Sequence, residues 1–349
     1  MLQHIVPQHY LKGFCDPVPS KRQGRVVWEF RFKDDVVCRR APKNVGRIAD
    51  YYSVETADGL HNPAIEGVLS QIESRTAPII ARLRDEHLAL ADEDRWWLAM
   101  FIAFQMVRGP AFRDHVEKAL GLIGTVMLRA MARREEYFAQ ALRGTPGSAE
   151  EDRTPAKIEE FRRMAAEPEK HFEISGTPEG SLRMMRLAPR FVPHIATLRW
   201  EFLVAGGGES FVTSDTPVTL RNPRLRPGFG AGLRLPGTEL SLPIGPRVCL
   251  RAIRDNATER GHPVTVNDDI VRDLNRERTR QAQLFIAGDN RTSVEWTKRR
   301  YKELLDRGEA HARPFEAYII EGTGPTTNVV HRVRVEPRCE ADEEKRAPG

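Results

Sequence analysis

The chain has 349 residues, of which 40% are hydrophobic and 30% are charged. This length predicts one large domain or two closely associated ones, and the composition is that of a soluble globular protein with a sizeable core. The net charge of +5, with a pI near 9.1, permits weak attraction to phosphate-rich partners but does not single them out.

The four cysteines, Cys15, Cys38, Cys249 and Cys339, lie far apart and form no CxxC pair. Their spacing argues against a zinc site and a disulfide framework, and it fits a reducing compartment. The first residues lack the pattern of a signal peptide, and the longest apolar stretch, Trp96–Val107, is too short to span a bilayer. We therefore expect a cytoplasmic protein without a membrane association.

The first 53 residues predict a short helix followed by a β-hairpin. Pro7 fits the first turn of a helix and Gly13 fits a C-terminal cap. Residues 26–32 and 36–40 read as two strands joined by a Lys-Asp-Asp turn. Residues 42–53 are expected to form an irregular loop.

The next part of the chain predicts helices. Residues 62–89 carry apolar side chains at helical spacing, and Asp92 is expected to cap the following helix, which Gly109-Pro110 ends. That helix is apolar on nearly all sides and therefore central to the core. Further helices are expected at 112–142, 155–167 and 178–197, with a mobile connector at 144–157.

From Leu198 the pattern favours strands. Residues 200–204 and 210–213 flank three glycines and predict a hairpin, and further strands are expected at 217–221, 239–242 and 247–253. Helices return at 267–283 and 293–305, and the charged tail 336–349 is expected to be disordered.

Together these elements predict an α+β fold in which a helical half packs against a mostly antiparallel sheet. We expect a single composite domain over residues 1–335. Its parts are an N-terminal helix and hairpin (1–53), a helical part (62–197), a strand-rich part (198–255) and late helices (267–305). The sequence leaves the oligomeric state open.

Common catalytic motifs are missing from the sequence. It contains no GxxxxGK[ST] phosphate loop, no HExxH helix, no GxSxG elbow and no GxGxxG after a strand. Function must therefore be sought in scattered polar residues among apolar neighbours.

Several motifs in order carry a resemblance to a known family. They are HIVPQHYL at 4–11, PKNV at 42–45, DYYS at 50–53, Glu66 with Glu73, QMVR at 105–108 and FVTSDTPV at 211–218. Over about residues 3–290 the chain resembles the domain-of-unknown-function family 4238. It departs from the family pattern at Thr216, where asparagine is more usual, and at Gly245, where serine is. The family has no agreed activity, so the resemblance implies no catalytic residue.

His4 is the first candidate for chemistry. It precedes a helix start, and an imidazole there could act as a general base or a metal ligand. The alternative is a histidine that hydrogen-bonds a loop carbonyl. Gln8 and Tyr10, in the same motif, are predicted to bind substrate.

Gln105 and Arg108 lie three residues apart on one face of the most apolar helix. A buried guanidinium needs a carboxylate or an anionic ligand. Arg108 is therefore either paired within the chain or available to a phosphate or carboxylate group. The candidate partners within the chain are Asp50, Glu66, Glu73 and Asp215. We predict Arg108 as a catalytic residue and Gln105 as a substrate-binding one.

Glu66 and Glu73 lie seven residues apart, on nearly the same helical face. With Asp215, they could hold Mg²⁺ or Mn²⁺, and Glu66 and Asp215 are the predicted metal ligands. The alternative is a solvated helix edge, which we prefer for Glu73.

Asp215 follows a predicted strand and precedes Pro217. It could bind metal, act as a base or orient His4, whereas the alternative is an Asx-type turn. Ser214 is a weaker candidate for a nucleophile, because nothing around it builds an oxyanion hole. Asn275 is predicted to bind substrate, and the neighbouring Arg276 and Arg280 fit either the same cleft or an exposed basic face.

The leading hypothesis is a metal-assisted phosphodiesterase or nuclease. Asp215 and Glu66 would bind Mg²⁺ or Mn²⁺, His4 would activate water, and Arg108 would stabilise phosphate charge. The alternative is a non-catalytic protein that binds nucleic acid or a nucleotide, or regulates a partner. A third reading makes these polar residues an internal scaffold.

Overall fold

The computed structural model describes residues 2–52, 64–143, 154–175, 185–224, 232–255, 263–310, 316–322 and 328–334. These residues form an α+β fold, as predicted. The chain divides into two compact units. The first comprises Met1–Arg113 and Leu182–Arg313, and the second comprises Asp114–Ser181 and Pro314–Gly349.

A small antiparallel pair opens the first unit. β1 (Leu2–His4) pairs with β4 (Arg47–Ala49), so that Gln3 lies opposite Ile48. Between them lie α1 (Gln8–Leu11), which confirms the predicted short helix, and two 3₁₀ turns at Lys12–Phe14 and Pro42–Asn44. The expectation of an irregular loop at 42–53 is wrong at β4, because three residues are too few to display an alternating pattern.

A four-stranded sheet follows in the order β3-β2-β11-β6, with every neighbouring pair antiparallel. Its strands are β2 (Val27–Arg31), β3 (Val36–Arg40), β11 (Phe285–Gly288) and β6 (Thr213–Ser214). The pairing of β2 with β3 confirms the predicted hairpin. Helix α11 (Arg291–Asp306) packs on this sheet through Val294 and Tyr301, which share a buried cluster with Phe30.

A five-stranded sheet has the order β10-β5-β9-β8-β7. Its strands are β5 (Arg199–Ala205), β7 (Thr219–Arg221), β8 (Glu239–Pro243), β9 (Val248–Ile253) and β10 (Pro263–Val266). Only the pairing of β10 with β5 is parallel among these described strands. The strands predicted at 217–221, 239–242 and 247–253 are confirmed.

The predicted hairpin of 200–204 with 210–213 is wrong. β5 pairs with β9 and β10, whereas Thr213 belongs to β6 in the other sheet. Two of the glycines between them serve close packing: a Cβ at Gly206 would lie 2.6 Å from the Cγ2 of Thr265, and one at Gly207 would meet the carboxylate of Asp268. The chain therefore leaves one sheet after β5 and enters the other at β6.

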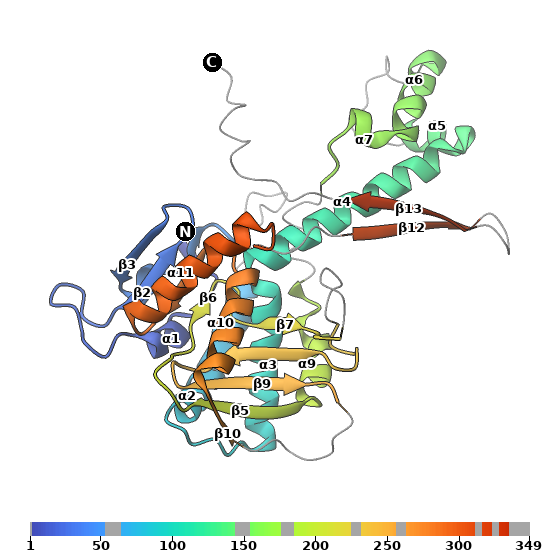
Figure 1. Cartoon of the computed structure of the whole chain (residues 1–349). Helices are drawn as coiled ribbons and strands as arrows, with labels where there is room; N and C mark the ends of the chain where they lie inside the picture. Colours follow the sequence, from blue (N-terminus) through green and yellow to red (C-terminus); the bar gives the residue numbers. More distant parts are fainter. Residues whose placement is uncertain are drawn as a thin grey trace. The chain divides into compact units, whose positions relative to one another are not determined.

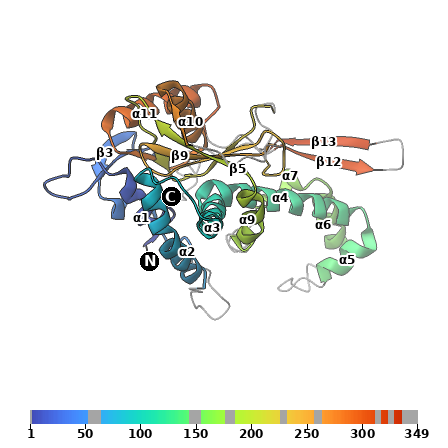
Figure 2. The ribbon, with the colours of Figure 1, turned by 90° about the horizontal axis from the view of Figure 1, so that it is seen from below.

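Helices cover both faces of the five-stranded sheet (Figure 1, Figure 2). On one face lie α3 (Asp92–Arg108) and α9 (Ala188–Ala196), and on the other lies α10 (Asp268–Gln281). Helix α2 (Ala64–Arg84) packs against α3. These elements confirm the helices predicted around residues 62–89, 92–108 and 267–283. Residues 178–184 of the helix predicted at 178–197 lie outside the described part.

The predicted cap at Asp92 is one residue out of place. Ala91 is the N-cap of α3, and Asp92 is the first helical residue. Asp92, Glu93 and Asp94 all occupy the first turn, where negative charge complements the helix dipole. The acidic residues therefore do mark the start of the helix, but they form its first turn and not its cap.

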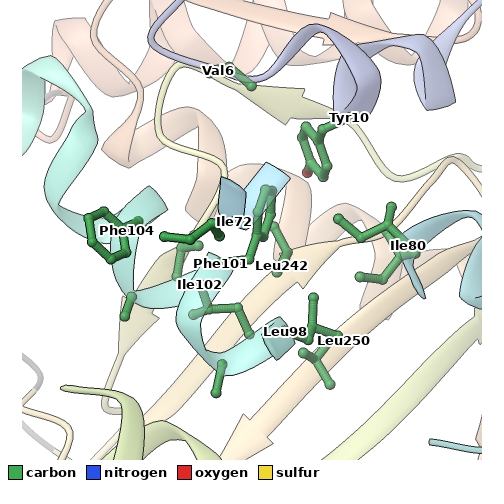
Figure 3. Packing of buried hydrophobic residues seen from close by; sticks show 14 of the residues in the cluster. Val6, Tyr10, Ile72, Ile80, Leu98, Phe101, Ile102, Phe104, Leu242 and Leu250 are labelled. Atoms are coloured by element: carbon green, nitrogen blue, oxygen red, sulfur yellow. The ribbon is translucent and has the colours of Figure 1, made fainter. Parts of the chain in front are cut away.

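The main hydrophobic core joins the N-terminal motif to α2, α3 and the five-stranded sheet (Figure 3). Tyr10 and Val6 enter it from the N-terminal segment, Phe101 from α3, and Leu242 and Leu250 from the sheet. Each of these side chains is at most 1% exposed. The N-terminal segment is therefore anchored in the core, which fixes its position and that of the polar side chains beside Val6 and Tyr10.

The second unit is described by itself. It contains the greater part of α4 (Pro110–Ala132), with α5 (Glu135–Arg143), α6 (Pro155–Ala166), α7 (Pro168–His171) and the antiparallel pair β12 (Glu316–Gly322) and β13 (Asn328–Arg334). The single helix predicted at 112–142 is thus two helices. Phe138 and Ile158 lie in a small core shared by α4, α5 and α6. Residues 144–153 of the predicted connector and the predicted tail lie outside the described residues.

Candidate functional site

A buried arginine organises the polar side chains near the N-terminal motif. Arg108, at the end of α3, is 5% exposed. Its Nη1 lies 2.5 Å from Oε1 of Glu73, its Nε donates to the hydroxyl of Tyr52 at 2.7 Å, and its Nη2 donates to the backbone carbonyl of His4 at 2.5 Å. Arg108 therefore ties α3 to α2, to β1 and to the turn that carries Tyr52. The structure brings His4 and Arg108 together as predicted, although through the backbone of His4.

Gln3 contacts the polar cluster that Arg108 forms with Glu73, Tyr52 and His4. Its Oε1 accepts the backbone N–H of Tyr52 at 2.6 Å, and its Nε2 donates to the carboxylate of Glu66. Both acidic residues of α2 thus face this cluster, Glu66 through Gln3 and Glu73 through Arg108. The expectation that Glu73 is a solvated helix edge is wrong, because Glu73 is the ion-pair partner of Arg108.

A second histidine lies beside Glu73. The Nδ1 of His9 is 3.8 Å from Oε2 of Glu73, and about a quarter of each side chain is exposed. The ring of His9 packs 6.1 Å from that of Phe101. Burial lowers the pKa of His9, and the carboxylate of Glu73 opposes that effect.

His4 is half-buried and has a different electrostatic setting. Burial lowers its pKa, the backbone carbonyl of Lys43 acts in the opposite direction, and the cations of Arg47 and Arg108 lower it further. The two imidazoles therefore share Arg108 and Glu73 as neighbours. After burial, Glu73 has the largest effect on the pKa of His9, whereas the carbonyl of Lys43 has the largest effect on that of His4.

Three buried polar atoms around this cluster have no hydrogen-bond partner within the described part of the chain. They are Nε2 of His4, Nε2 of His9 and Oε1 of Gln105. Buried polar atoms are nearly always paired in folded proteins, and exceptions mark catalytic groups or bound molecules. The three atoms come from β1, α1 and α3, the elements that carry His4, His9 and Arg108.

Asp215 is held in a different way. Its carboxylate is completely buried and accepts the backbone N–H groups of Gln283, Leu284 and Phe285 at 3.1–3.3 Å. Burial raises the pKa of Asp215 to about 6, against the opposing effect of these hydrogen bonds. Its backbone lies near the end of α3, since a Cβ on Gly109 would be 3.0 Å from the carbonyl of Asp215. Its carboxylate, however, is committed to the start of β11.

The predicted metal ligands are not gathered into one donor set. Glu66 contacts Gln3, and Asp215 contacts backbone amides at β11. Across the residues that the structure describes, no three histidine, cysteine, aspartate or glutamate side chains are close enough together to hold a metal ion. The metal-binding role of Glu66 and Asp215 and the catalytic role of Asp215 stay predictions.

The predicted substrate-binding residues divide between the core and the cluster. Tyr10 is buried and donates to the carbonyl of Pro243 at 2.7 Å, and Asn275 uses both ends of its amide to hold Val212 and Ser210. Gln105 is buried next to the cluster, and Gln8 is half-buried on α1. The polar atoms of Tyr10 and Asn275 are thus engaged inside the protein, whereas Gln8 and Gln105 lie on the elements that carry the histidines and Arg108.

The weaker candidates also have structural partners. The hydroxyl of Ser214 donates to the carbonyl of Thr216 at 2.9 Å and accepts its N–H at 3.1 Å, which is a local turn. Arg280 pairs with Glu277 at 2.5 Å, and Arg276 is exposed.

Sequence reasoning missed His9, Tyr52 and Gln3. His9 could have been found, because it is the second imidazole of the motif that already contains His4. Gln3 and Tyr52 carried no such signal. They meet only because β1 pairs with β4, a pairing between short strands that the sequence does not reveal.

The fold and this cluster define an α+β protein in which an N-terminal motif places two histidines beside a buried arginine–glutamate pair. The family model described as "Protein of unknown function (DUF4238)" matches residues 2–292, and the chain belongs to this family. Neither the curated proteins nor the solved structures contain a match to the chain. Among the described residues, no helix has the length and apolar character needed to cross a membrane.

Proposed function

We propose that this protein is a hydrolase of phosphate-containing substrates, a phosphodiesterase or nuclease, with His4 and His9 as its acid–base pair. The observation that carries the proposal is the pair of imidazoles whose Nε2 atoms have no partner among the described residues. Both lie next to the ion pair of Arg108 and Glu73. Two imidazoles near an arginine match the needs of phosphodiester cleavage, in which one proton is removed and another is supplied.

The surroundings assign a role to each histidine. Glu73 stabilises the protonated form of His9, which suits a general acid. Arg47 and Arg108 stabilise the neutral form of His4, which suits a general base. Burial lowers the pKa of both histidines, so the carboxylate of Glu73 next to His9 is what distinguishes the acid from the base in this proposal.

The protons balance in a simple hydrolysis. Neutral His4 accepts a proton at Nε2 from a water molecule, whose oxygen forms a bond to phosphorus. The bond between phosphorus and the leaving oxygen breaks, and that oxygen receives the proton from Nε2 of His9. Exchange with solvent then returns His4 to its neutral form and His9 to its protonated form.

Arg108 is a positioning residue in this proposal. Its guanidinium already binds Glu73, Tyr52 and the backbone of His4, so it holds β1, which carries His4, and α2, whose Glu73 contacts His9, against α3. Its positive charge also favours a phosphate group nearby. Gln105, with an unpartnered buried oxygen, is proposed to accept a hydrogen bond from the substrate.

The proposed hydrolysis can be tested with and without a divalent cation. Because the described residues present no three-donor group, the acid–base pair is expected to work without a metal. A requirement for Mg²⁺ or Mn²⁺ would favour the metal-assisted mechanism predicted from Glu66 and Asp215. Assays in Mg²⁺, in Mn²⁺ and with a chelator therefore separate the two mechanisms.

The experiment is a cleavage assay on a chromogenic phosphodiester, single- and double-stranded DNA, and RNA. His4→Gln and His9→Gln should each lower cleavage by about 10²-fold to 10⁴-fold, the usual contribution of a general acid or base. His87→Gln is the matched control, since His87 is exposed in the turn after α2. Absence of cleavage by the wild type on every substrate, or full activity of both variants, would contradict the proposal.

Non-catalytic binding of nucleic acid is the second candidate. The specific observation is a pair of arginines near the ring of Trp28: Arg39 lies 5.7 Å and Arg291 lies 5.6 Å from the ring centre. Arginines beside an aromatic ring suit a strand of phosphates and bases. Binding without cleavage, weakened by salt and by Arg291→Met but not by His9→Gln, would favour this candidate.

A further inference from the structure

A second arginine is buried far more completely than Arg108, but without a carboxylate. Arg278 lies on α10 and is 0% exposed. Its Nη2 is 3.2 Å from the hydroxyl and 3.4 Å from the carbonyl of Ser241 on β8. Its Nε and Nη1 have no hydrogen-bond partner in the part of the chain that the structure describes. This guanidinium therefore faces the five-stranded sheet with two nitrogens unused.

The neighbours of Arg278 do not supply a negative charge. Glu277, the next acidic residue along α10, forms its ion pair with Arg280 at 2.5 Å. Burial raises the pKa of the Cys249 thiol to about 11 and that of the Tyr10 hydroxyl even further, so both groups are neutral at physiological pH. Arginine does not lose its proton in proteins. The charge of Arg278 thus lacks a counter-charge among the described residues.

The same region has more hydrogen-bond donors than acceptors. Ser241 and Thr219 share one hydrogen bond of 2.7 Å between their hydroxyls, which uses one of their two hydroxyl hydrogens. The hydroxyl pair that Nη2 of Arg278 contacts therefore has one hydrogen left to donate. The thiol of Cys249 and the hydroxyl of Tyr10 donate to backbone carbonyls instead. A buried group of spare donors around one positive charge calls for an anion, because water would add donors but no charge.

We propose that Arg278, with the hydroxyl pair of Ser241 and Thr219, binds a single halide ion, chloride under physiological conditions. One monovalent anion balances the single charge of the guanidinium. A monatomic ion also needs less space between α10 and the sheet than a phosphate group would. This site is separate from the acid–base cluster and does not depend on the proposed hydrolase function.

The direct test is a crystal structure of the full chain grown in sodium bromide, with anomalous diffraction data. We expect an anomalous difference peak within hydrogen-bonding distance of Nε or Nη1 of Arg278. Density at this position without an anomalous signal would identify a water molecule and overturn the proposal, as would the absence of any density there.

Thermal unfolding provides a second test in solution. A ligand that binds only the folded state raises the melting temperature as its concentration increases. Chloride titrated against gluconate at constant ionic strength should therefore raise the melting temperature of the wild type. Arg278→Met should lose this dependence, whereas Arg299→Met, which removes an exposed arginine on α11, should keep it. The same chloride dependence in Arg278→Met and in the wild type would contradict the proposal. If Arg278→Met does not fold, the bromide experiment on the wild type still decides.

Discussion

Arg108 holds three segments together because a buried cation requires partners. Each of its three donor nitrogens has one: a carboxylate, a hydroxyl and a backbone carbonyl. Its guanidinium also lies 5.6 Å from the ring centre of Tyr52. The carboxylate of Glu73 is 26% exposed, so it can be solvated if Arg108 is removed. Because Glu73 is more exposed than Arg108, removing Arg108 is expected to lower the free energy of unfolding less than it would in a fully buried ion pair.

Arg108→Met should lower the free energy of unfolding by about 2 kcal/mol, the loss expected when hydrogen bonds to a charged group are removed. A fully buried pair would lose about 3–5 kcal/mol, because the stranded charge could not reach water. Urea denaturation measures the difference, and Arg299→Met serves as an exposed control. A loss below about 0.5 kcal/mol, the range of ordinary surface substitutions, would show that Arg108 does not hold these segments.

The histidines predict a loss of stability in acid. Burial lowers the pKa of both His4 and His9 below 6.5, so the unfolded state binds protons before the folded state does. Their contribution to stability is complete above pH 6.5 and is lost as the pH falls from there through their lowered pKa values. Chemical denaturation between pH 7.5 and pH 5 should show a weaker pH dependence in His9→Gln than in the wild type. An unchanged dependence in both His4→Gln and His9→Gln would contradict the burial of these rings.

Asp215 is expected to make the folded protein less stable as the pH rises. Its pKa is raised by burial from 3.8 to about 6, so the folded state keeps a proton that the unfolded state releases. Its contribution is therefore fully present below pH 3.8 and is lost as the pH rises to about 6, a change on the order of 3 kcal/mol. Asp215→Asn should lack this slope between pH 4 and pH 6. If the free energy of unfolding changes with pH in the same way in Asp215→Asn and in the wild type, the three backbone hydrogen bonds outweigh burial and keep the carboxylate ionised.

At the scale of elements, local patterns were predictable and long-range pairings were not. The apolar spacing of α2 and α3 and the turn between β2 and β3 are encoded within short stretches of sequence. The placement of β5 and β6 in different sheets depends on β9, β10 and β11, which lie much further along the chain. Periodicity carries no information about such partners.

The same limit explains the outcome for the candidate site. A polar residue on an apolar helix reveals that Arg108 needs a partner, and Glu73 was among the candidates. Asp215 gave an equal signal, but its partners are backbone amides of residues 283–285, which have no sequence signature. His9 lies in the same motif as His4, but the sequence does not show that Glu73 of α2 lies beside it.

The N-cap of α10 offers a test of element boundaries. The side chain of Asn267 accepts the N–H of Ile270 at 3.2 Å. Asn267→Ala should lower the free energy of unfolding by about 1 kcal/mol, whereas Asn267→Asp should retain the acceptor and the stability. Thermal unfolding of the two variants checks this. Equal melting temperatures for Asn267→Ala and the wild type would place the start of α10 elsewhere.

At the scale of the whole molecule, the proposed acid–base residues all belong to the first compact unit. His4 and His9 come from its opening motif, Glu73 from α2, and Gln105 and Arg108 from α3. The motif itself is packed into the main core through Val6 and Tyr10 (Figure 3). The histidines are therefore positioned by the global fold of this unit and not by a surface loop, which suits groups that must hold a fixed geometry.

The most direct test of the acid–base pair is the pH dependence of kcat/KM for phosphodiester cleavage in the presence of a chelator. The wild type should give a bell-shaped profile, because cleavage requires neutral His4 and protonated His9. The residual activity of His4→Gln should lose the acidic limb of the bell, and that of His9→Gln should lose the alkaline limb. Profiles in which both variants retain both limbs would contradict the assignment of His4 as base and His9 as acid.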